Sequence, residues 1–356
     1  MERMRWMNIP FCAGGSPNIA TKAMEAIMNF NCSMCGKEYP IGGLDYQCAC
    51  GGLFKLTKKK EEKIATTVSL GEVKTPLVKK KLLQREVYLK IDYMSPSGSF
   101  KDRGAFVLIN ALKELGIKEV VEDSSGNAGA AIAAYCAAAG IRCNIYLPEG
   151  TSAGKIKQIS AYKANVVKIP GTRGDTAKAI LGAADKTYYA SHMYNPLFFE
   201  GTKSFAYELN EQIGVPDYLF VPAGGGTLLL GAYMGFCEIG KLPRIIAVQT
   251  KNCAPLFSKF HHQPFNGCLP TIAEGIAIPE PKRIDEMIDA IRQSRGDVII
   301  VDDDQVIAAQ NLLGETGFYI EPTAGAAVAG MLQYLNEGYD NKLKIVVPLT
   351  GIGLKK

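Results

Sequence analysis

The chain lacks a long uninterrupted hydrophobic segment. No run reaches the ~18 consecutive apolar residues that a membrane-spanning helix needs, because glycine, proline or charged residues interrupt the most apolar stretches. Residues 1–30 also lack the apolar core and cleavage site of a secretory signal. We therefore expect a globular protein of the reducing cytoplasm, with no membrane partner.

Two common nucleotide-binding motifs are absent as well. The glycine-rich stretch at residues 222–231 has neither the GK[ST] ending of a P-loop nor the GxGxxG spacing of a dinucleotide site. This absence argues against a nicotinamide oxidoreductase. No internal repeat or low-complexity tract is evident in the 356 residues, of which 47% are hydrophobic. Such a chain is long enough for one large or two medium cores.

Four of the ten cysteines crowd together as Cys32-x-x-Cys35 and Cys48-x-Cys50. Four thiolates at such spacing match a structural zinc ribbon, because tetrahedral zinc accepts four sulfur ligands. The one-residue spacer of the second pair is tighter than the usual spacer of about two to four residues. Reduced cysteines without metal are therefore the alternative. The other cysteines stand singly, and we expect them to be buried, inert thiols.

A zinc-ribbon nucleic-acid module is an alternative of a different class. It would use the cysteine segment and the basic run at residues 58–63, but acidic residues interrupt that run and the net charge is only +5. The cysteine segment offers few aromatic side chains for stacking on bases, namely Tyr39, Tyr46 and Phe54. Such a charge run is more typical of a solvated linker, so no nucleic-acid partner is expected.

From about residue 86 the chain alternates short β-branched runs with longer alanine-rich runs. The expected strands are residues 86–94, 118–125, 143–148, 165–170, 187–191, 217–223, 244–250, 297–302 and 342–351. The expected helices are residues 100–116, 127–140, 175–186, 201–214, 227–240, 283–296, 303–317 and 322–338. This alternation predicts an α/β fold with parallel sheets and helices on both faces. Nine strands favour two open sheets over one.

Lys101 stands in SPSGSFKDRGA, where a glycine and serine loop opens a predicted helix. The positive end of the helix and a partly desolvated pocket would both lower the pKa of this amine. A lower pKa favours the uncharged amine that condenses with an aldehyde. Considered alone, the motif is also compatible with a surface lysine in a capped first turn beside Asp102 and Arg103.

The loop SSGNAGA, residues 124–130, directly follows KEVVED in the predicted strand. Backbone N–H groups of Ser124, Ser125 and Gly126 could hold a carboxylate, and Asn127 could hydrogen-bond a ring hydroxyl. The alternative is simple capping of the following helix by serine or asparagine.

Two further loops lie at predicted strand ends. Residues 224–227, GGGT, form a nest of N–H groups that would suit a phosphate, and the alternative is a tight turn. Thr350 ends the last strand, where its hydroxyl could face a pyridine nitrogen, and the alternative is a turn residue beside Gly351.

Together these motifs resemble those of fold-type II enzymes dependent on pyridoxal phosphate (PLP), the tryptophan synthase beta-like superfamily, and within it the threonine synthase-like family. The matching elements are SGSFKDRG around Lys101, SSGNAG around Asn127, GGGT at residues 224–227, EPTAGAAVAG from Glu321 and TGIGLK around Thr350. The resemblance runs from about residue 70 to the C-terminus. The cysteine segment also looks like the N-terminal knuckle of some threonine synthases.

The resemblance implies a role for each matching residue. Lys101 would form the Schiff base with PLP and move protons, Asn127 would contact the cofactor O3′, and Thr350 would face its ring nitrogen. The residues implied to bind the cofactor phosphate are Gly224, Gly225, Gly226 and Thr227. Those implied to bind the amino-acid substrate are Ser97, Ser99, Ser124, Ser125, Gly126 and Asn195, with Asn195 facing a distal phosphate.

The resemblance also implies a domain plan and a homodimer. We expect an extension at residues 1–27, a zinc-ribbon-like segment at 28–57, a large PLP-binding domain from 58–104 plus 191–356, and a small mobile domain at 105–190.

The implied reaction converts O-phospho-L-homoserine and water to L-threonine and phosphate. One departure from the family pattern bears on it, because Leu197, Phe198 and Phe199 follow the Asn-Pro pair where many threonine synthases have basic or polar residues. The alternative is β-replacement or β-elimination on O-phosphoserine or serine, as in cysteate synthase-like or cysteine synthase-like enzymes.

Overall fold

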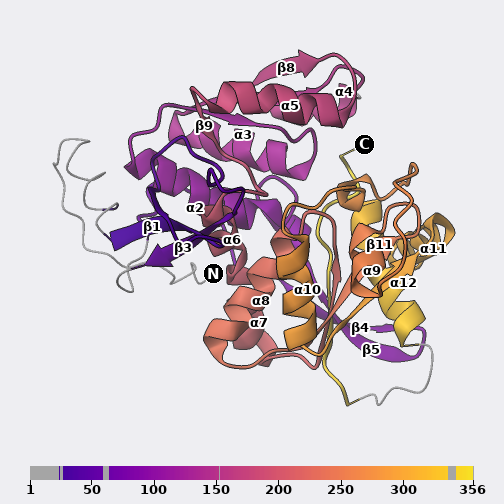
Figure 1. Cartoon of the computed structure of the whole chain (residues 1–356). Helices are drawn as coiled ribbons and strands as arrows, with labels where there is room; N and C mark the ends of the chain where they lie inside the picture. The colour runs from indigo at the N-terminus through magenta and orange to yellow at the C-terminus, as the bar shows by residue number, and fades with distance from the viewer. Residues whose placement is uncertain (1–23, 25–26, 59–63, 152, 336–341, 356) are drawn as a thin grey trace. The chain divides into compact units, whose positions relative to one another are not determined.

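The computed structural model describes residues 24, 27–58, 64–151, 153–335 and 342–355 (Figure 1). The predicted extension at residues 1–27 lies outside these residues except for Met24 and Ile27. The chain divides into two compact units. Unit 1 comprises Met1–Val73 and Lys101–Gly201, and unit 2 comprises Lys74–Phe100 and Thr202–Lys356. Among the described residues, no helix has both the length and the apolar character that crossing a bilayer requires.

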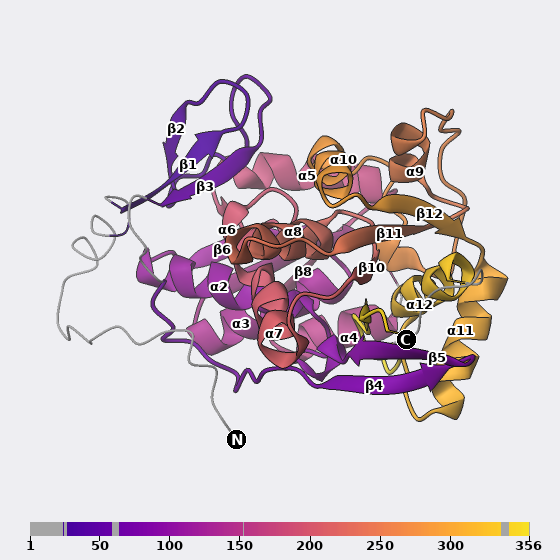
Figure 2. The same cartoon turned by 90° about the horizontal axis from the view of Figure 1, so that it is seen from below.

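The cysteine segment of unit 1 forms a three-stranded antiparallel sheet in the order β2-β1-β3 (Figure 2). Its strands are β1 (Met28–Cys32), β2 (Glu38–Pro40) and β3 (Phe54–Lys58). In β1 buried and half-buried residues alternate, which places Phe30 inside, where its ring stacks on that of Phe54 at 5.7 Å between centroids. The turn between β1 and β2 carries Cys35.

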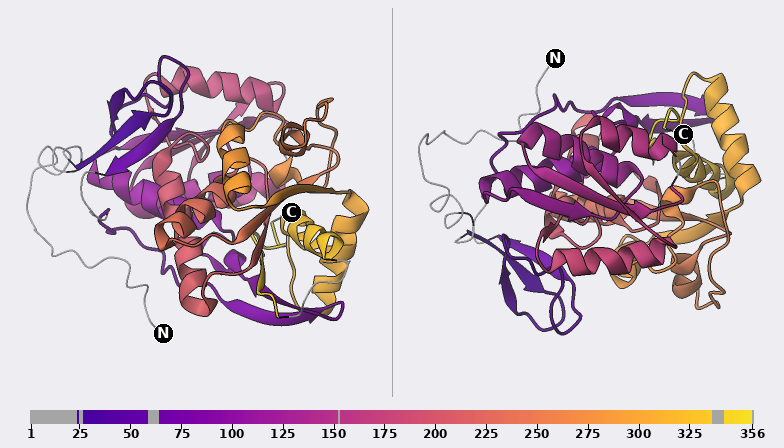
Figure 3. Two further views of the ribbon diagram at one scale, coloured as in Figure 1. Left: turned by 60° about the horizontal axis from the view of Figure 1, so that its bottom comes forward. Right: turned by 90° about the horizontal axis from the view of Figure 1, so that it is seen from above.

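The body of unit 1 is a parallel four-stranded sheet in the order β8-β7-β6-β9. Its strands are β6 (Glu119–Glu122), β7 (Arg142–Pro148), β8 (Asn165–Ile169) and β9 (Tyr188–Tyr189). Its helices are α2 (Lys101–Glu114), α3 (Asn127–Ala139), α4 (Ala153–Ala161), α5 (Arg173–Ala184) and α6 (Pro196–Thr202). Helices α3 and α5 both pack on β7, and the right-hand view of Figure 3 shows helices on both sides of the strands. The small alanine side chains of α3 favour the helix and allow it to pack along α2.

Unit 2 contains a six-stranded sheet in the order β12-β11-β10-β13-β5-β4. Its strands are β4 (Leu77–Leu82), β5 (Arg85–Lys90), β10 (Tyr218–Pro222), β11 (Arg244–Thr250), β12 (Asp297–Val301) and β13 (Ile345–Pro348). Buried apolar residues fill β10 and β11 almost without interruption, as expected for parallel strands covered on both faces.

Helices cover both faces of this sheet (Figure 3, left). The helices of unit 2 are η1 (Asp92–Met94), α7 (Ser204–Ile213), α8 (Thr227–Ile239), α9 (Pro255–Phe260), η2 (Glu274–Ile276), α10 (Ile284–Gln293), α11 (Asp303–Glu315) and α12 (Pro322–Tyr334). Helix α12 packs across β10, β11, β12 and β13, and α8 packs on β10. The predicted α/β fold with two parallel sheets is confirmed.

Strand β4 is an exception to the parallel arrangement, because it pairs with β5 in an antiparallel hairpin. Leu83 and Gln84 close the hairpin with φ values of 42° and 71°, the positive angles that a two-residue turn requires. Glycine or asparagine usually occupies such positions, so Leu83 and Gln84 do not predict this turn. The lysines of LVKKKL suit an edge strand, since charged residues discourage pairing with another chain.

The division into units differs from the predicted domain boundaries at both ends. Unit 1 includes the cysteine segment, starts its second part at Lys101 and extends to Gly201. The reason is the packing of α6 on α2, because a Cβ atom on Gly104 would lie 2.3 Å from the Phe198 ring. Residues 191–201 therefore belong with α2. The predicted mobility of residues 105–190 stays a prediction.

The structure joins Cys253 and Cys268 in a disulfide, so the expectation of single inert thiols is wrong for these two residues. Of the other single cysteines, Cys136 and Cys143 are buried as expected, Cys237 is exposed, and Cys12 lies outside the described residues. The Cα atoms of Cys253 and Cys268 lie 4.4 Å apart across 15 residues of sequence. Asn252 aligns the two segments, because its carbonyl accepts from Leu269 N and its side chain donates to Pro270 O. These loop contacts leave no periodic pattern in the sequence.

Candidate active site

Lys101 is the first residue of α2 and is partly exposed. Its Nζ lies 5.7 Å from the centroid of the Phe198 ring. Phe198 is fully buried in α6, and Gly104 allows it to lie against the first turn of α2. The packing of α6 on α2 therefore places the Phe198 ring next to the Lys101 amine, the candidate Schiff-base residue.

A buried acid and a buried imidazole lie in the same unit. Glu122 ends β6, and its Oε1 lies 2.6 Å from Nδ1 of His192. The His192 ring meets the Phe198 ring edge-on at 6.0 Å. Burial raises the pKa of Glu122 well above its usual range, with Asp123 adding to the shift. Burial likewise lowers the pKa of His192 well below its usual range, and the positive charge of Lys101 adds to that shift.

The loop at residues 124–127 follows β6 and leads into α3. Gly126 is the N-cap of α3, and its surroundings would leave an added Cβ without any contact within 4 Å. Gly126 has no side chain to cap the helix, and its own N–H donates to the Ser124 hydroxyl at 3.3 Å. Tyr189 fixes the base of the loop by donating a 2.6 Å hydrogen bond to Asp123. The first turn of α3 thus presents backbone N–H groups on an open side.

In unit 2 the glycine loop at residues 224–227 connects β10 with α8. Gly226 is the N-cap of α8 in the left-handed conformation, with φ of 83°, which glycine adopts without strain. No described side chain caps α8 either. The Thr227 carbonyl accepts a 3.0 Å hydrogen bond from the hydroxyl of Thr202, which also belongs to unit 2, and this bond anchors the loop.

Thr350 is fully buried at the end of the segment that follows β13. Its hydroxyl donates to Glu321 at 3.2 Å, and its carbonyl accepts from Phe100 N at 2.9 Å. Ser99, also fully buried, forms an isolated bridge with Gly351. Within unit 2 the structure therefore brings Ser97 and Ser99 to the same backbone as Thr350.

Asn195 is engaged by protein groups in unit 1. Its Nδ2 donates to the Tyr188 hydroxyl at 2.8 Å, and its Oδ1 accepts from Leu197 N at 3.0 Å. The Tyr188 hydroxyl in turn donates to Ile41 O in the cysteine segment. Both ends of the amide thus hold α6 in place, and the substrate role of Asn195 stays a prediction.

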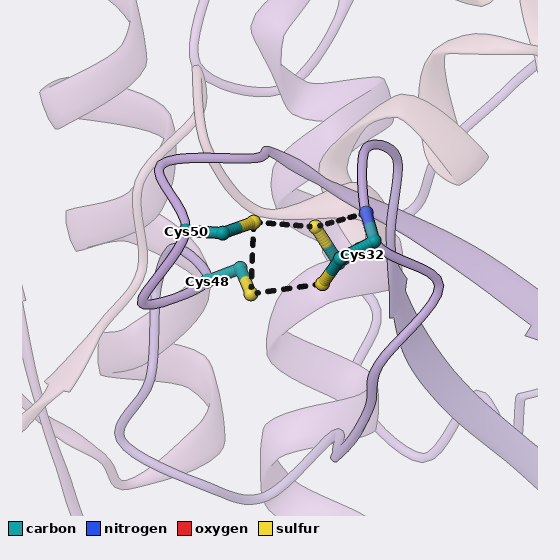
Figure 4. A group of neighbouring side chains, drawn as sticks. Cys32, Cys48 and Cys50 are labelled. Atoms are coloured by element: carbon teal, nitrogen blue, oxygen red, sulfur yellow. Dashed lines mark hydrogen bonds between the residues drawn. The ribbon is translucent and has the colours of Figure 1, made fainter.

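The four cysteines of the N-terminal segment converge. The sulfur atoms of Cys32, Cys35, Cys48 and Cys50 all lie within 4.8 Å of one another. Figure 4 shows Cys32, Cys48 and Cys50 with their sulfur atoms turned toward each other, and the closest pairs are 3.4 to 3.6 Å apart. The Tyr39 hydroxyl donates to Cys48 Sγ at 3.1 Å. Four sulfur ligands around tetrahedral zinc would lie about 3.8 Å apart, so the donor set fits this metal.

The site elements also fit a cofactor that carries a phosphate and an aldehyde. Helices α5 and α11 begin with complete side-chain capping boxes at Thr172 and Asp302, whereas α3 and α8 begin at glycine without a side-chain cap. The N-termini of such helices bind anions through their backbone N–H groups. The buried Ser99 hydroxyl has no hydrogen-bond partner among the described residues and so is available to a ligand.

A family model described as "Pyridoxal-phosphate dependent enzyme" matches residues 68–351. The chain therefore belongs to the pyridoxal-phosphate dependent enzyme family. Membership also confirms the prediction that the protein is an enzyme dependent on PLP.

Curated relatives narrow the similarity to threonine synthases. The chain is 33% identical to the threonine synthase of Methanocaldococcus jannaschii, and the match covers 91% of this chain and 92% of that one. It is 35% identical to the threonine synthase of Bacillus sp. (strain ULM1), over 81% of this chain and 85% of that one. The predicted threonine synthase-like resemblance is confirmed.

Solved structures share the fold. Maize serine racemase superposes with a TM-score of 0.69 over 79% of this chain and 88% of that one, at 23% identity. At this identity the likeness shows the fold alone. Together with the two parallel sheets, it confirms the fold-type II architecture.

The sequence analysis did not predict two side-chain contacts of the site. They are the contact of Glu122 with His192 and that of Glu321 with Thr350. Two weak signals were present. Glu122 and Asp123 are adjacent acids directly after the valine pair of the strand, and His192 is one of only three histidines. Neither signal indicates that Glu122 and His192 meet, because 70 residues separate them.

Proposed function

We propose that the chain acts as a threonine synthase, converting O-phospho-L-homoserine and water to L-threonine and phosphate. The observation that carries this proposal is the 33% identity to a threonine synthase over 91% of this chain and 92% of that one. In this conversion protons leave Cα and Cβ, phosphate leaves Cγ, protons return to Cγ and Cα, and water adds its hydroxyl at Cβ.

The proposed roles follow the geometry of each unit. PLP, when bound, supplies an electron sink that makes the substrate Cα–H acidic. Lys101 would hold the cofactor aldehyde and would remove and return the substrate proton, since its amine is partly exposed at a helix start. The N–H groups at residues 224–227 would bind the cofactor phosphate. Those at residues 124–126 would bind the substrate carboxylate.

Three further contacts complete the proposed site. Asn127 would contact the cofactor O3′, and the Thr350 hydroxyl would face the ring nitrogen. The Ser99 hydroxyl, buried and without a partner among the described residues, would bind the substrate together with Ser97.

Phosphate release tests the proposed substrate. Purified protein with PLP is expected to release phosphate from O-phospho-L-homoserine and to form threonine, with little release from O-phosphoserine. Threonine is identified by chromatography. Faster release from O-phosphoserine would overturn the assignment in favour of the alternative below.

One observation favours the alternative, a β-replacement or β-elimination enzyme acting on O-phosphoserine or serine. The amide of Asn195 is bonded to Tyr188 and to the backbone of α6, so it is poorly placed to receive a distal phosphate. Leu197, Phe198 and Phe199 are all buried, so they supply no polar contact for one. Serine, which carries no phosphate, would not need these contacts.

We also propose that the four clustered cysteines hold one structural zinc ion. The support is the convergence of four sulfur atoms within 4.8 Å and the hydrogen bond from Tyr39 to Cys48. Hydrogen-bond donors of this kind, which contact a ligand and not the metal, orient metal-bound thiolates. Metal analysis of the purified protein should find about one zinc per chain. A metal-free protein with unchanged stability would refute this role. A homodimer, expected from the family resemblance, is part of the same proposal and is tested by light scattering. The expected cytoplasmic location stays a prediction.

A further inference from the structure

Glu122 and His192 form a pair with an unusual hydrogen-bond balance. Their contact, Oε1 to Nδ1 at 2.6 Å, is buried, with the Glu122 side chain fully enclosed and the His192 side chain 8% exposed. The second carboxyl oxygen of Glu122, Oε2, is buried and has no hydrogen-bond partner among the described residues. A buried carboxylate normally satisfies both oxygens, because leaving one unpaired costs its full desolvation.

The geometry is consistent with one shared proton and no net charge. If Glu122 is protonated on Oε1 and donates to Nδ1, then Oε2 is the weakly accepting oxygen of a neutral acid. Leaving such an oxygen unpaired costs far less than leaving half of a buried carboxylate unpaired. Burial acts in the same direction on both partners, because it raises the pKa of Glu122 and lowers the pKa of His192.

The pair interacts with Lys101 electrostatically, and both contact the same ring, that of Phe198. The Phe198 ring lies 5.7 Å from Lys101 Nζ and 6.0 Å from the His192 ring. The charge of Lys101 acts on both members of the pair. Among the described residues, the other titratable groups facing the pair are Asp123, Cys136, Cys143 and Tyr189 on the side of Glu122, and Arg173 on the side of His192.

We propose that Glu122 and His192 are a positioning pair for Lys101: by sharing one proton they prevent the buried carboxyl from becoming a counterion that would hold the amine as ammonium. This inference rests on the proposed role of Lys101 as the residue that binds PLP. An ionised Glu122 would stabilise the ammonium form, and an ammonium cannot attack an aldehyde. His192 acts here by keeping the proton on the pair.

Removal of His192 should therefore slow the reaction of Lys101, and further removal of the acid should restore it. The reaction to follow is condensation with PLP, in which the amine nitrogen bonds to the aldehyde carbon and water leaves with the carbonyl oxygen. Borohydride reduction and peptide mapping quantify the product at Lys101. Without the imidazole, the protonated Glu122 Oε1 loses its acceptor, which disfavours the neutral acid and lets the charge of Lys101 favour ionisation. His192→Leu is therefore expected to condense about tenfold more slowly at pH 7.

The double variant His192→Leu, Glu122→Gln separates the electrostatic role from packing. It lacks both the imidazole and the ionisable acid, so its condensation rate is expected to return to within about threefold of the wild-type rate. If the double variant is as slow as His192→Leu, the histidine acts by packing and the proposal is overturned.

Nuclear magnetic resonance tests the proton state in the unmodified protein. The chain has three histidines, His192, His261 and His262, so the ring nitrogens of His192 can be assigned by comparison with His192→Leu. We expect a neutral ring with the proton on Nε2 from about pH 6 to about pH 8, the range in which an unperturbed histidine titrates. A doubly protonated ring in this range overturns the proposal. If wild-type Lys101 fails to trap PLP, the proposed function fails, and the nitrogen spectrum still decides the state of the pair.

Discussion

Two buried acid and base pairs, one in each unit, differ in how completely they are hydrogen-bonded. In unit 2, Lys90 Nζ contacts Glu208 Oε2 at 2.6 Å, Gln212 Oε1 at 2.9 Å and Thr75 O at 2.7 Å. The same Glu208 oxygen also accepts from Thr75. In unit 1, Glu122 and His192 share a single contact, and one carboxyl oxygen has no described partner.

The difference distinguishes a fully hydrogen-bonded structural pair from a pair that lacks part of its hydrogen bonding. Lys90 and Glu208 are both fully buried, so each charge depends on the other and on the amide and carbonyl around them. Three bonds to the ammonium use all its protons. The incomplete pair lies near Lys101, and perturbed, poorly satisfied groups cluster at functional sites more often than in structural networks.

Lys101→Arg should give the largest effect. Arginine keeps the positive charge but is not deprotonated at neutral pH, so it cannot bond covalently to the aldehyde. We expect activity to fall by roughly a factor of a thousand or more, since both the covalent bond and the proton transfer are lost. Lys113→Arg, in the last turn of the same helix, is the matched control. Turnover assays and PLP absorbance measure both, and retained PLP trapping in Lys101→Arg would contradict the assignment.

Lys90→Met should destabilise the protein strongly without a chemical role. It leaves Glu208 buried without its cation, which costs about 3–5 kcal/mol of unfolding free energy. The double variant Lys90→Met, Glu208→Leu should recover much of that loss, because it removes the stranded charge. Urea unfolding measures the unfolding free energy of the wild type, of Lys90→Met and of the double variant.

An exposed pair provides the control for Lys90. Lys79 and Glu86 lie 2.7 Å apart with side chains about half exposed, at 49% and 51%. Lys79→Met should cost about 0–1 kcal/mol, because solvent screens surface ion pairs. A loss at Lys79 equal to the loss at Lys90 would show that burial does not explain the contrast.

The disulfide between Cys253 and Cys268 should stabilise unit 2 by a comparable but smaller amount. Closing a loop of 15 residues restricts the unfolded chain by about 3 kcal/mol in the loop-entropy view. Cys268→Ser should lose this amount, and reduction of the wild type should match it. Cys237→Ser, which alters a cysteine outside any disulfide, is the control. Thermal unfolding with and without reductant provides the measurement, and equal melting temperatures for Cys268→Ser and Cys237→Ser would count against the bond.

The sequence predicted the repeating part of the fold because that part has a period. Nine expected strands correspond to β5 through β13, since each is a short β-branched run between glycine-rich loops. The hairpin partner β4 was missed, because its turn uses Leu83 and Gln84 instead of glycine. Helices α4, α6 and α9 were missed as well, since they span only nine, seven and six residues.

The site was predictable where one local motif carries one role. Lys101, Asn127 and Thr350 each stand in a loop whose chemistry can be interpreted in isolation. The contact of Glu122 with His192 and that of Thr350 with Glu321 are tertiary, so no spacing along the chain reveals them. Asn195 shows the opposite case, because a matching motif gave no indication that Tyr188 would bind its amide.

The pH dependence of stability distinguishes the two buried pairs by a smaller effect. In the folded protein the pKa of Glu122 is raised by burial and the pKa of His192 is lowered by burial. If the folded pair shares one proton, as proposed, it holds that proton between pH 4.5 and pH 6.5, the ordinary values of the two groups. Between those values the unfolded chain also holds one proton, on histidine. The pair therefore adds no slope to the unfolding free energy in that range.

Glu122→Gln should create a slope there. Only His192 then titrates, and because its folded pKa is depressed, its stabilising contribution is present above pH 6.5 and is lost as the pH falls. The variant should lose about 1.4 kcal/mol per pH unit relative to wild type between pH 6.5 and pH 4.5. Urea unfolding at several pH values measures the difference. A parallel pH profile in the two proteins would mean that the folded His192 is already protonated, and the contrast with Lys90 and Glu208 would then be one of bonding alone.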